Sequence, residues 1–233
     1  MGSQYFDQLY SIHKNDLIVL SPGDRTRPLI IICRYYLVNL ADIRSGLIVR
    51  DKMEPGKILE IVEMGNPILR ERAREVDDIH DPGVQSFIDD LIATGINANG
   101  VGIAAPQVDV PKRIFIISSR PNVRYPDAPL MEPEAVINPE IISYSDETVK
   151  GWEGCLSIPG IRGLVPRHSY VRVKYISRDG KVEERQLSDF IARIFQHEYD
   201  HLNGVLFLDR LESNRDIITE REYIKLLQRE SEE

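Results

Sequence analysis

The stretch QHEYDHLNG at residues 196–204 contains two histidines four positions apart, His197 and His201, with Glu198 between them. Residues at that spacing lie one turn above each other on a helix, with Cβ atoms about 5 to 6 Å apart. Both imidazoles can therefore reach a single metal ion while Glu198 sits beside it. This H-E-x-x-H pattern is typical of zinc-dependent hydrolases, so the stretch predicts a metal site on a helix.

The helix that carries this pair is predicted to cover residues 188–202. Serine and aspartate at its start can cap the free amide groups, and an Asn-Gly pair at 203–204 ends it. Phe190 and Ile194 precede His197 on the same helical face. Two interpretations stay open for them, an apolar floor beside the metal or an ordinary place in the core.

Two histidines leave a tetrahedral site incomplete, and three sources of a third ligand can be compared. One protease class uses a histidine at the position of Phe207, which cannot bind metal. Another class uses a downstream glutamate such as Glu220 or Glu222, although their charge-rich helix favours a solvated face. The third candidate is Cys155, whose thiolate would complete a Cys-His-His site and leave the fourth position for water. A lone cysteine is, however, most often a small buried hydrophobe.

Small residues dominate the segment GVGIAAPQ at residues 100–107. Two glycines and two alanines after a helix end would let a substrate backbone lie close to this one. A phosphate-binding loop is the rival interpretation. No Lys-Ser/Thr pair follows, however, and Pro106 interrupts a helix that would continue from the loop.

The remaining pattern predicts an α+β fold, with helices packed on antiparallel strands, because no regular alternation of strand and helix is seen. Asn66-Pro67 and Asp81-Pro82 are good helix starts, and Asp179-Gly180 is a good hairpin turn. Helices are predicted at 68–74, from 82 to the stop at 99–100, at 188–202 and at 219–229, and strands at 113–118, 135–144, 170–176 and 182–187.

Composition excludes several classes of protein. A net charge of −8 argues against non-specific nucleic-acid binding, which needs clustered Lys and Arg. The longest apolar stretch, residues 29–38, falls short of the ~20 residues of a membrane helix, so no membrane span is expected. The first residues lack the order of a secretory signal and are too acidic for a transit peptide, which predicts a cytoplasmic protein. Only Cys33 and Cys155 are present, too few for a disulfide scaffold.

Three parts of the chain are expected. Residues 1–52 are predicted to be an N-terminal extension to which no role can be assigned. Residues 53–212 form the predicted catalytic domain, and residues 213–233 a charged C-terminal helix.

The segments at 100–107, 153–157 and 196–204 together resemble the peptide deformylase family, whose motifs are G-x-G-x-A-A-P-Q, E-G-C-L-S and Q-H-E-x-D-H-x-x-G. The resemblance implies antiparallel β-sheets packed around a central helix that carries the H-E-x-x-H motif. It also implies one divalent metal ion per chain, Fe²⁺ in the native enzyme with Zn²⁺, Ni²⁺ or Co²⁺ able to occupy the site. The implied ligands are Cys155, His197 and His201.

The resemblance implies further roles at matching positions. Gln107 and the backbone N–H of Leu156 would stabilise the oxyanion, and Glu198 would act as general base and then general acid. The positions that would hold the peptide backbone are Gly102, Ile103 and Arg162. Phe190 and Ile194 would then belong to an apolar pocket for methionine.

The implied substrates are N-formyl-methionyl nascent peptides, from which formate is released. Residues 215–233 carry more acidic than basic side chains, unlike the basic helix with which some family members dock on the ribosome, so only transient ribosome association is expected. Neither nucleic acid nor membrane is expected as a partner. A metalloprotease and a metal-stabilised binding module remain the rival functional classes.

Overall fold

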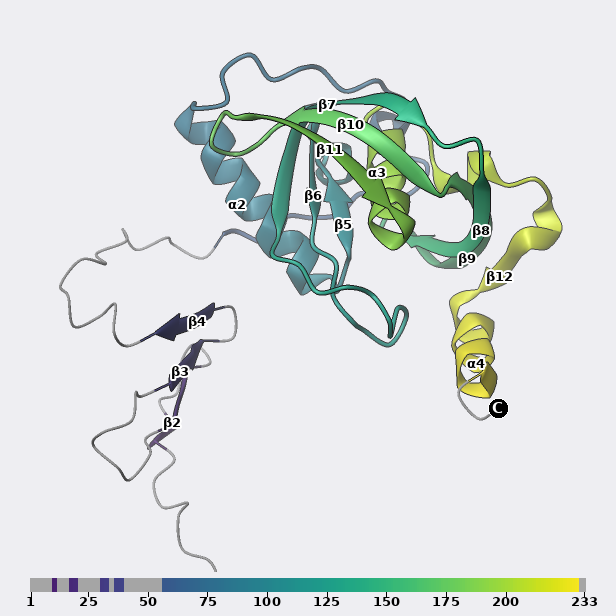
Figure 1. Ribbon diagram of the computed structural model, residues 1–233, viewed down its shortest axis with the longest axis horizontal. Coiled ribbons are helices and arrows are strands. Elements are labelled where there is room, and N and C mark those ends of the chain that lie inside the picture. The colour runs from purple at the N-terminus through teal and green to yellow at the C-terminus, as the bar shows by residue number, and fades with distance from the viewer. Residues whose placement is uncertain (1–9, 12–16, 21–29, 34–35, 40–55, 231–233) are drawn as a thin grey trace, which may run out of the picture. The chain divides into compact units, whose positions relative to one another are not determined.

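The computed structural model describes residues 10–11, 17–20, 30–33, 36–39 and 56–230 of the chain. The chain divides into two compact units, Met1–Glu54 and Pro55–Glu233 (Figure 1). The expected boundary at 52–53, and most of the stretch from which a targeting signal was excluded, lie outside the described residues.

The first unit contains a four-stranded antiparallel sheet with the strands in sequence order. The apolar runs of this region, which show no clear period in the sequence, supply three of its four strands. The four strands are β1 (Tyr10–Ser11), β2 (Leu17–Leu20), β3 (Ile30–Cys33) and β4 (Tyr36–Asn39).

The second unit contains a five-stranded antiparallel sheet in the order β11-β10-β7-β6-β5. The predicted strands are confirmed, and so is the β10–β11 hairpin, whose Gly180 adopts the left-handed φ of 79° that its turn requires. Of the five strands in this sheet, only β5 was not predicted from the sequence. The strands are β5 (Gly102–Ala104), β6 (Ile114–Ile117), β7 (Glu134–Tyr144), β10 (Tyr170–Ile176) and β11 (Val182–Ser188).

A second sheet of this unit has three antiparallel strands in the order β12-β9-β8. They are β8 (Thr148–Cys155), β9 (Ile158–His168) and β12 (Ile217–Thr219). Strands β8 and β9 form a hairpin. The sequence did not predict this sheet, because glycines interrupt the β-strand pattern of these two strands. Two of these glycines leave room for guanidinium groups: a Cβ at Gly151 would lie 2.8 Å from Arg193 Cζ, and one at Gly154 2.5 Å from Arg162 Cζ.

Three α-helices and four 3₁₀ turns complete the described part of this unit. The Asp81 side chain accepts from Val84 N at 3.0 Å and so caps the first helix, as predicted. The helices are α2 (Pro82–Asn97), α3 (Asp189–His201) and α4 (Glu220–Glu230), close to the predicted bounds. The 3₁₀ turns are η1 (Pro67–Arg70), η2 (Ala105–Val108), η3 (Phe207–Arg210) and η4 (Asn214–Asp216).

The predicted helix at 68–74 is wrong beyond its first turn. Asn66 caps η1 by accepting from Ile68 N, but Glu71 is extended and the turn ends there. The following backbone pairs with other segments instead, since Ala73 N donates to Leu202 O at 2.9 Å and Arg113 N donates to Arg74 O at 2.7 Å. These long-range hydrogen bonds override the local helical preference.

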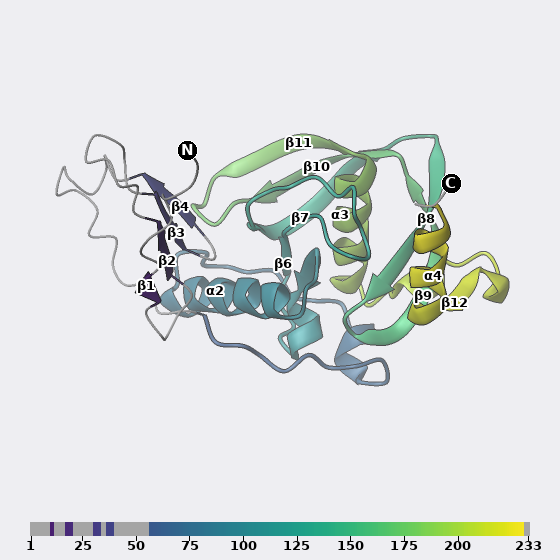
Figure 2. The same ribbon diagram turned by 90° about the horizontal axis from the view of Figure 1, so that it is seen from below.

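The core lies on both faces of the five-stranded sheet. Phe115 and Ile117 of β6 pack with Phe195 of α3 on one face, while Ile114 and Ile116 pack with α2 on the other. Figures 1 and 2 show α2 alongside β5 and β6, and α3 between the five-stranded sheet and the β8–β9 hairpin. The predicted α+β class with antiparallel sheets is confirmed. No helix in residues 56–230 is long and apolar enough to cross a membrane.

Candidate metal centre and active site

Cys155 and the two motif histidines meet at one point. Cys155 is the last residue of β8, and His197 and His201 lie one turn apart on α3. One donor atom from each side chain lies within 4.8 Å of the others, and Cys155 Sγ is 3.2 Å from His201 Nε2. The structure thus brings together the three residues that the sequence proposed as ligands.

The donor set fits a divalent transition metal. One thiolate and two imidazoles suit iron, zinc, nickel or cobalt, and three protein ligands leave a position for water. Glu198 Oε2, next to this group, is buried and has no hydrogen-bond partner in residues 56–230. A buried carboxylate oxygen needs a polar partner, so the site is built for a ligand or water at this position.

Glu153 holds the first histidine in place. Its Oε2 lies 2.9 Å from His197 Nδ1, which leaves Nε2 of that ring for a metal. The same carboxylate accepts from Arg167 Nε at 2.9 Å and from Arg193 Nη1 at 2.9 Å. Burial alone would raise the pKa of Glu153, but the Arg167 charge and the His197 hydrogen bond hold it far below its usual value.

The ion pairs continue behind the metal group. Arg167 Nη1 donates to Asp200 Oδ2 at 2.6 Å, and Arg210 Nη2 donates to Asp200 Oδ1 at 2.7 Å. We call Glu153, Arg167, Arg193, Asp200 and Arg210 the rear network. The sequence did not predict these ion pairs, although Glu153 and Asp200 lie inside the quoted motifs.

The two histidines differ in their proton affinity. Burial and the His197 charge lower the pKa of His201 well below its usual value, so its imidazole is neutral, as a ligand must be. Burial also opposes charge on His197, but its hydrogen bonds to Cys155 and Glu153 raise its pKa well above the usual value. These surroundings therefore favour a proton on His197 over one on His201.

Glu198 lies against the small residue at the start of β5. A Cβ at Gly102 would overlap Glu198 Oε1, so only glycine leaves room for this carboxylate. Burial raises the pKa of Glu198 to about 7, with the His197 charge as an opposing influence. A carboxyl group with that pKa can both accept and release a proton near neutral pH.

Gln107 of η2 points its amide nitrogen at the metal group. Its Oε1 accepts from Ala104 N at 2.8 Å, which fixes the orientation of the amide. Its Nε2 donates to Ser157 Oγ at 3.2 Å and lies 3.4 Å from Cys155 Sγ. The side chain therefore presents an amide donor beside Cys155.

A cavity of about 310 Å³ opens beside this group. Phe190 and Ile194 line it, which supports the pocket interpretation of these residues. Ile103 does not line it, because its side chain is 1% exposed and packs in the core near Gly95. The other candidate residues on its wall are Gly102, Gln107, Cys155, Leu156, Arg162, His197 and Glu198.

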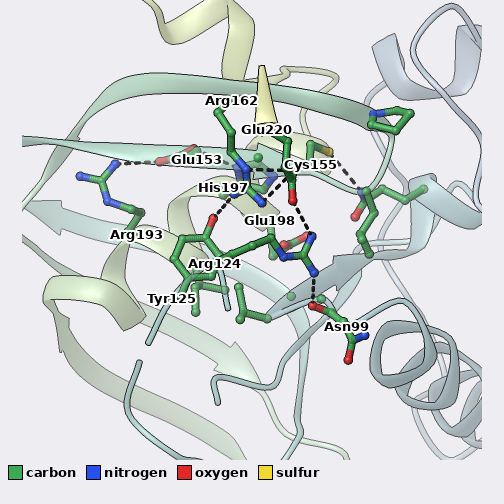
Figure 3. A pocket seen from close by; sticks show the side chains of 18 of the residues that line it. Asn99, Arg124, Tyr125, Glu153, Cys155, Arg162, Arg193, His197, Glu198 and Glu220 are labelled. Carbon is green, nitrogen blue, oxygen red and sulfur yellow. Dashed lines mark hydrogen bonds and ion pairs between the residues drawn. The ribbon is translucent and has the colours of Figure 1, made fainter. Parts of the chain in front are cut away.

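Arg162 lines the cavity together with residues that the sequence did not assign to the site (Figure 3). Its Nε donates to Glu220 Oε2 at 3.2 Å, and its Nη1 donates to Tyr125 OH at 2.7 Å. Glu220 and Glu222, the alternative ligands, are thus engaged elsewhere, Glu220 with Arg162 and Glu222 with Lys225. Phe207 is a buried core residue, with its ring centroid 6.1 Å from that of His197.

Comparisons of this chain with family models, known sequences and solved structures all match peptide deformylases. The family model for polypeptide deformylases matches residues 58–216. Peptide deformylase 2 of Nostoc sp. is 60% identical over 171 residues, which cover 73% of this chain and 96% of that protein. A Met-Ala-Ser-bound peptide deformylase structure from Acinetobacter baumannii is 45% identical with a TM-score of 0.66, covering 67% of this chain and 99% of that one. The Thermotoga maritima peptide deformylase structure is 40% identical with a TM-score of 0.60, at the same two coverages.

Proposed function

Because this chain belongs to the peptide deformylase family, we propose that the group of Cys155, His197 and His201 is the metal site at which it works. The family reaction is metal-dependent hydrolysis of the formyl group from the N-formyl-methionine of nascent polypeptides, with release of formate. The observation that carries the assignment is the meeting of these three donors beside a cavity that Cys155, His197, Glu198 and Gln107 line.

The proposed native metal is Fe²⁺, with Zn²⁺, Ni²⁺ or Co²⁺ able to take its place, since all accept thiolate and imidazole ligands. A divalent cation in such a site supplies a Lewis acid and lowers the pKa of water from 15.7 to about 7. The protein's own part is to place the Cys155 sulfur beside the two imidazoles and to turn the His197 ring through Glu153.

Glu198 is the proposed proton carrier. Its buried carboxyl takes the proton from the attacking water and delivers it to the amine that leaves the formyl carbon. The pKa of about 7 supports this role, because the group changes its protonation state at the operating pH. Gly102 keeps the carboxyl in position, since any larger residue would displace it.

Gln107 and the backbone N–H of Leu156 are the proposed donors to the formyl oxygen as its negative charge develops. The Ala104 N–H bond to Gln107 Oε1 supports this, because the amide is oriented before substrate arrives. Leu156 lines the same cavity and directly follows Cys155, so its N–H belongs to the backbone beside the metal.

The peptide is proposed to lie along β5, the last strand in the order of its sheet. An extended peptide can add to such an edge through main-chain hydrogen bonds, which explains how Ile103 contributes while its side chain is buried. Phe190 and Ile194 would receive the methionine side chain, and Arg162 would bound the peptide on the opposite side. The two sheets around α3 are proposed to be the frame that fixes these parts.

Nascent chains as substrate place the proposed reaction in the cytoplasm, at the ribosome. Helix α4 carries charges of both signs, with Arg221, Lys225 and Arg229 among its glutamates. We therefore propose transient association with ribosomes rather than docking through α4.

An anaerobic assay of protein reconstituted with Fe²⁺, Zn²⁺, Ni²⁺ or Co²⁺ tests the function. Formyl-Met, acetyl-Met and free Met versions of one peptide are offered, and the products are weighed by mass spectrometry. Loss of formyl only, with equimolar formate and no activity in chelator-treated protein, is expected. Cleavage of an internal peptide bond, or no turnover with any metal, would contradict the assignment.

A further inference from the structure

The pairing of β12 with β9 brings the C-terminal segment to the cavity. Ile218 of β12 lies opposite Arg162 of β9 in the register of the sheet. Glu220, two residues further on and the first residue of α4, therefore comes to lie beside the Arg162 guanidinium. Glu220 lines the same cavity as Cys155 and His197.

The Arg162 guanidinium is enclosed by this segment and by the loop that contains Tyr125. Its Nε and Nη2 both lie 3.2 Å from Glu220 Oε2, and the rings of Tyr223 and Tyr125 lie 5.3 and 5.4 Å from its Cζ. Only 2% of the side chain is exposed. Such a buried cation needs an anionic partner, and Glu220 is that partner.

A second cation shares the same carboxylate. Arg124 Nη1 lies 3.9 Å from Glu220 Oε1, and Figure 3 shows the Glu220 carboxylate between the two guanidinium groups. The Arg124 and Glu220 side chains are 24% and 34% exposed, so they face the open part of the cavity. Two guanidinium charges and one carboxylate charge leave one net positive charge at this wall.

Without Glu220 this wall would attract acidic side chains, because guanidinium groups bind carboxylates through paired, charge-assisted hydrogen bonds. A preference of that kind is unsuited to an enzyme that must accept the varied sequences that follow an initiator methionine. The intramolecular carboxylate already occupies both arginines, so an acidic substrate side chain must compete with it.

We propose that Glu220 is a specificity-determining residue, which prevents Arg162 and Arg124 from selecting substrates with an acidic residue after the methionine. The inference rests on the proposed function, since it takes the peptide to extend from the metal group toward α4. The proposal thus gives the first residue of α4 a role in substrate specificity.

The test compares wild type with Glu220→Gln and with Glu222→Gln as the matched control. Glu222 lies on the same helix, but its side chain is 54% exposed and pairs with Lys225. The substrates are formyl-Met tripeptide amides that carry Asp, Asn or Lys at the second or the third position. The amidated end removes the terminal carboxylate, which would itself be an acidic group.

Glu220→Gln is expected to raise the kcat/KM ratio of Asp to Asn peptides about three- to tenfold at one or both positions, and to lower the ratio of Lys to Asn. The effect should shrink between about 0.05 and about 0.5 M salt, as for charges that are partly exposed. Glu222→Gln should leave both ratios as in wild type. Unchanged ratios at both positions in a folded Glu220→Gln protein would overturn the proposal.

Arg124→Gln provides an independent test if Glu220→Gln fails to fold. It removes the more exposed cation and leaves the Glu220–Arg162 pair, so the ratio of Asp to Asn peptides should fall below the wild-type value. A ratio that stays the same or rises would count against the proposal. Failure of wild type to deformylate the Asn peptides would instead refute the proposed function, so the two failures are distinguishable.

Discussion

Two groups of paired charges flank the metal ligands, and they differ in burial. In the rear network, Glu153, Arg167 and Asp200 are enclosed, each at most 6% exposed as side chains, and only Arg210, at 49%, reaches well into solvent. The mouth network, made of Arg124, Tyr125, Arg162 and Glu220, keeps part of its charge in contact with solvent. Breaking a buried ion pair costs roughly 3–5 kcal/mol, whereas an exposed pair is worth only about 0–1. The rear network is thus suited to hold the histidine still, and the mouth network to respond to substrate.

Cys155→Ala is expected to have the largest effect, because this residue is the proposed third metal ligand. Loss of an outer-shell partner costs about 10–100-fold in metal affinity, and loss of a ligand should exceed that. Metal analysis after dialysis should find the variant depleted and inactive, while Glu220→Gln keeps its metal. Full metal occupancy and full activity in Cys155→Ala would refute the Cys-His-His site.

Glu198→Ala should separate chemistry from metal binding. The three ligands and both networks remain, but the proton carrier is gone, so activity should fall about 100-fold or more at unchanged metal content. Steady-state kinetics with parallel metal analysis measures this. Equal activity in the two proteins would show that another group moves the proton.

Glu153→Gln tests the rear network directly. The amide keeps the size of the side chain but loses the charge that holds His197 and two arginines. Metal affinity, measured by competition with a chelator, should weaken about 10–100-fold. The control is Glu212→Gln, whose carboxylate is 61% exposed and pairs only with Lys150 among the described residues. Equal affinities in the two variants would mean that Glu153 does not orient the ligand.

The smallest effect on activity is expected from a change that leaves both networks intact. Deletion of residues 1–52 removes no proposed ligand, oxyanion donor or cavity residue, so the truncated protein should retain most of its activity. The measurement is kcat/KM on a neutral formyl-Met peptide, with metal content matched to wild type. A soluble, metal-loaded but inactive protein would show that this segment supports the site.

The sequence predicted the parts of the site that depend on local spacing. His197 and His201 are four residues apart on a helix with readable ends, and α3 lies where those ends place it. The third ligand required a comparison of candidates, because Cys155 is 42 residues before His197 and no periodicity connects them. The resemblance to a family, rather than the spacing, selected it.

The parts that the sequence missed depend on how strands pair. Glu153 meets Arg167 only because β8 and β9 form a hairpin, and the glycines of that hairpin concealed it. Glu220 was expected on a solvated face, since the charges of its helix have both signs. It lies at the cavity instead because β12 pairs beside Arg162, a register that no local pattern shows.

Three successive residues at the end of β8 have three different roles. Glu153 holds His197, Gly154 leaves room for Arg162, and Cys155 joins the donor group. Side chains alternate between the faces of a strand, so a slip of one residue in the pairing of β8 with β9 would misplace all three at once. A mispaired hairpin would therefore lose all three roles together and would not assemble the metal site. Metal loading during refolding should rise together with protection of the β8–β9 amides from hydrogen exchange, which makes the bound ion a reporter of correct strand pairing.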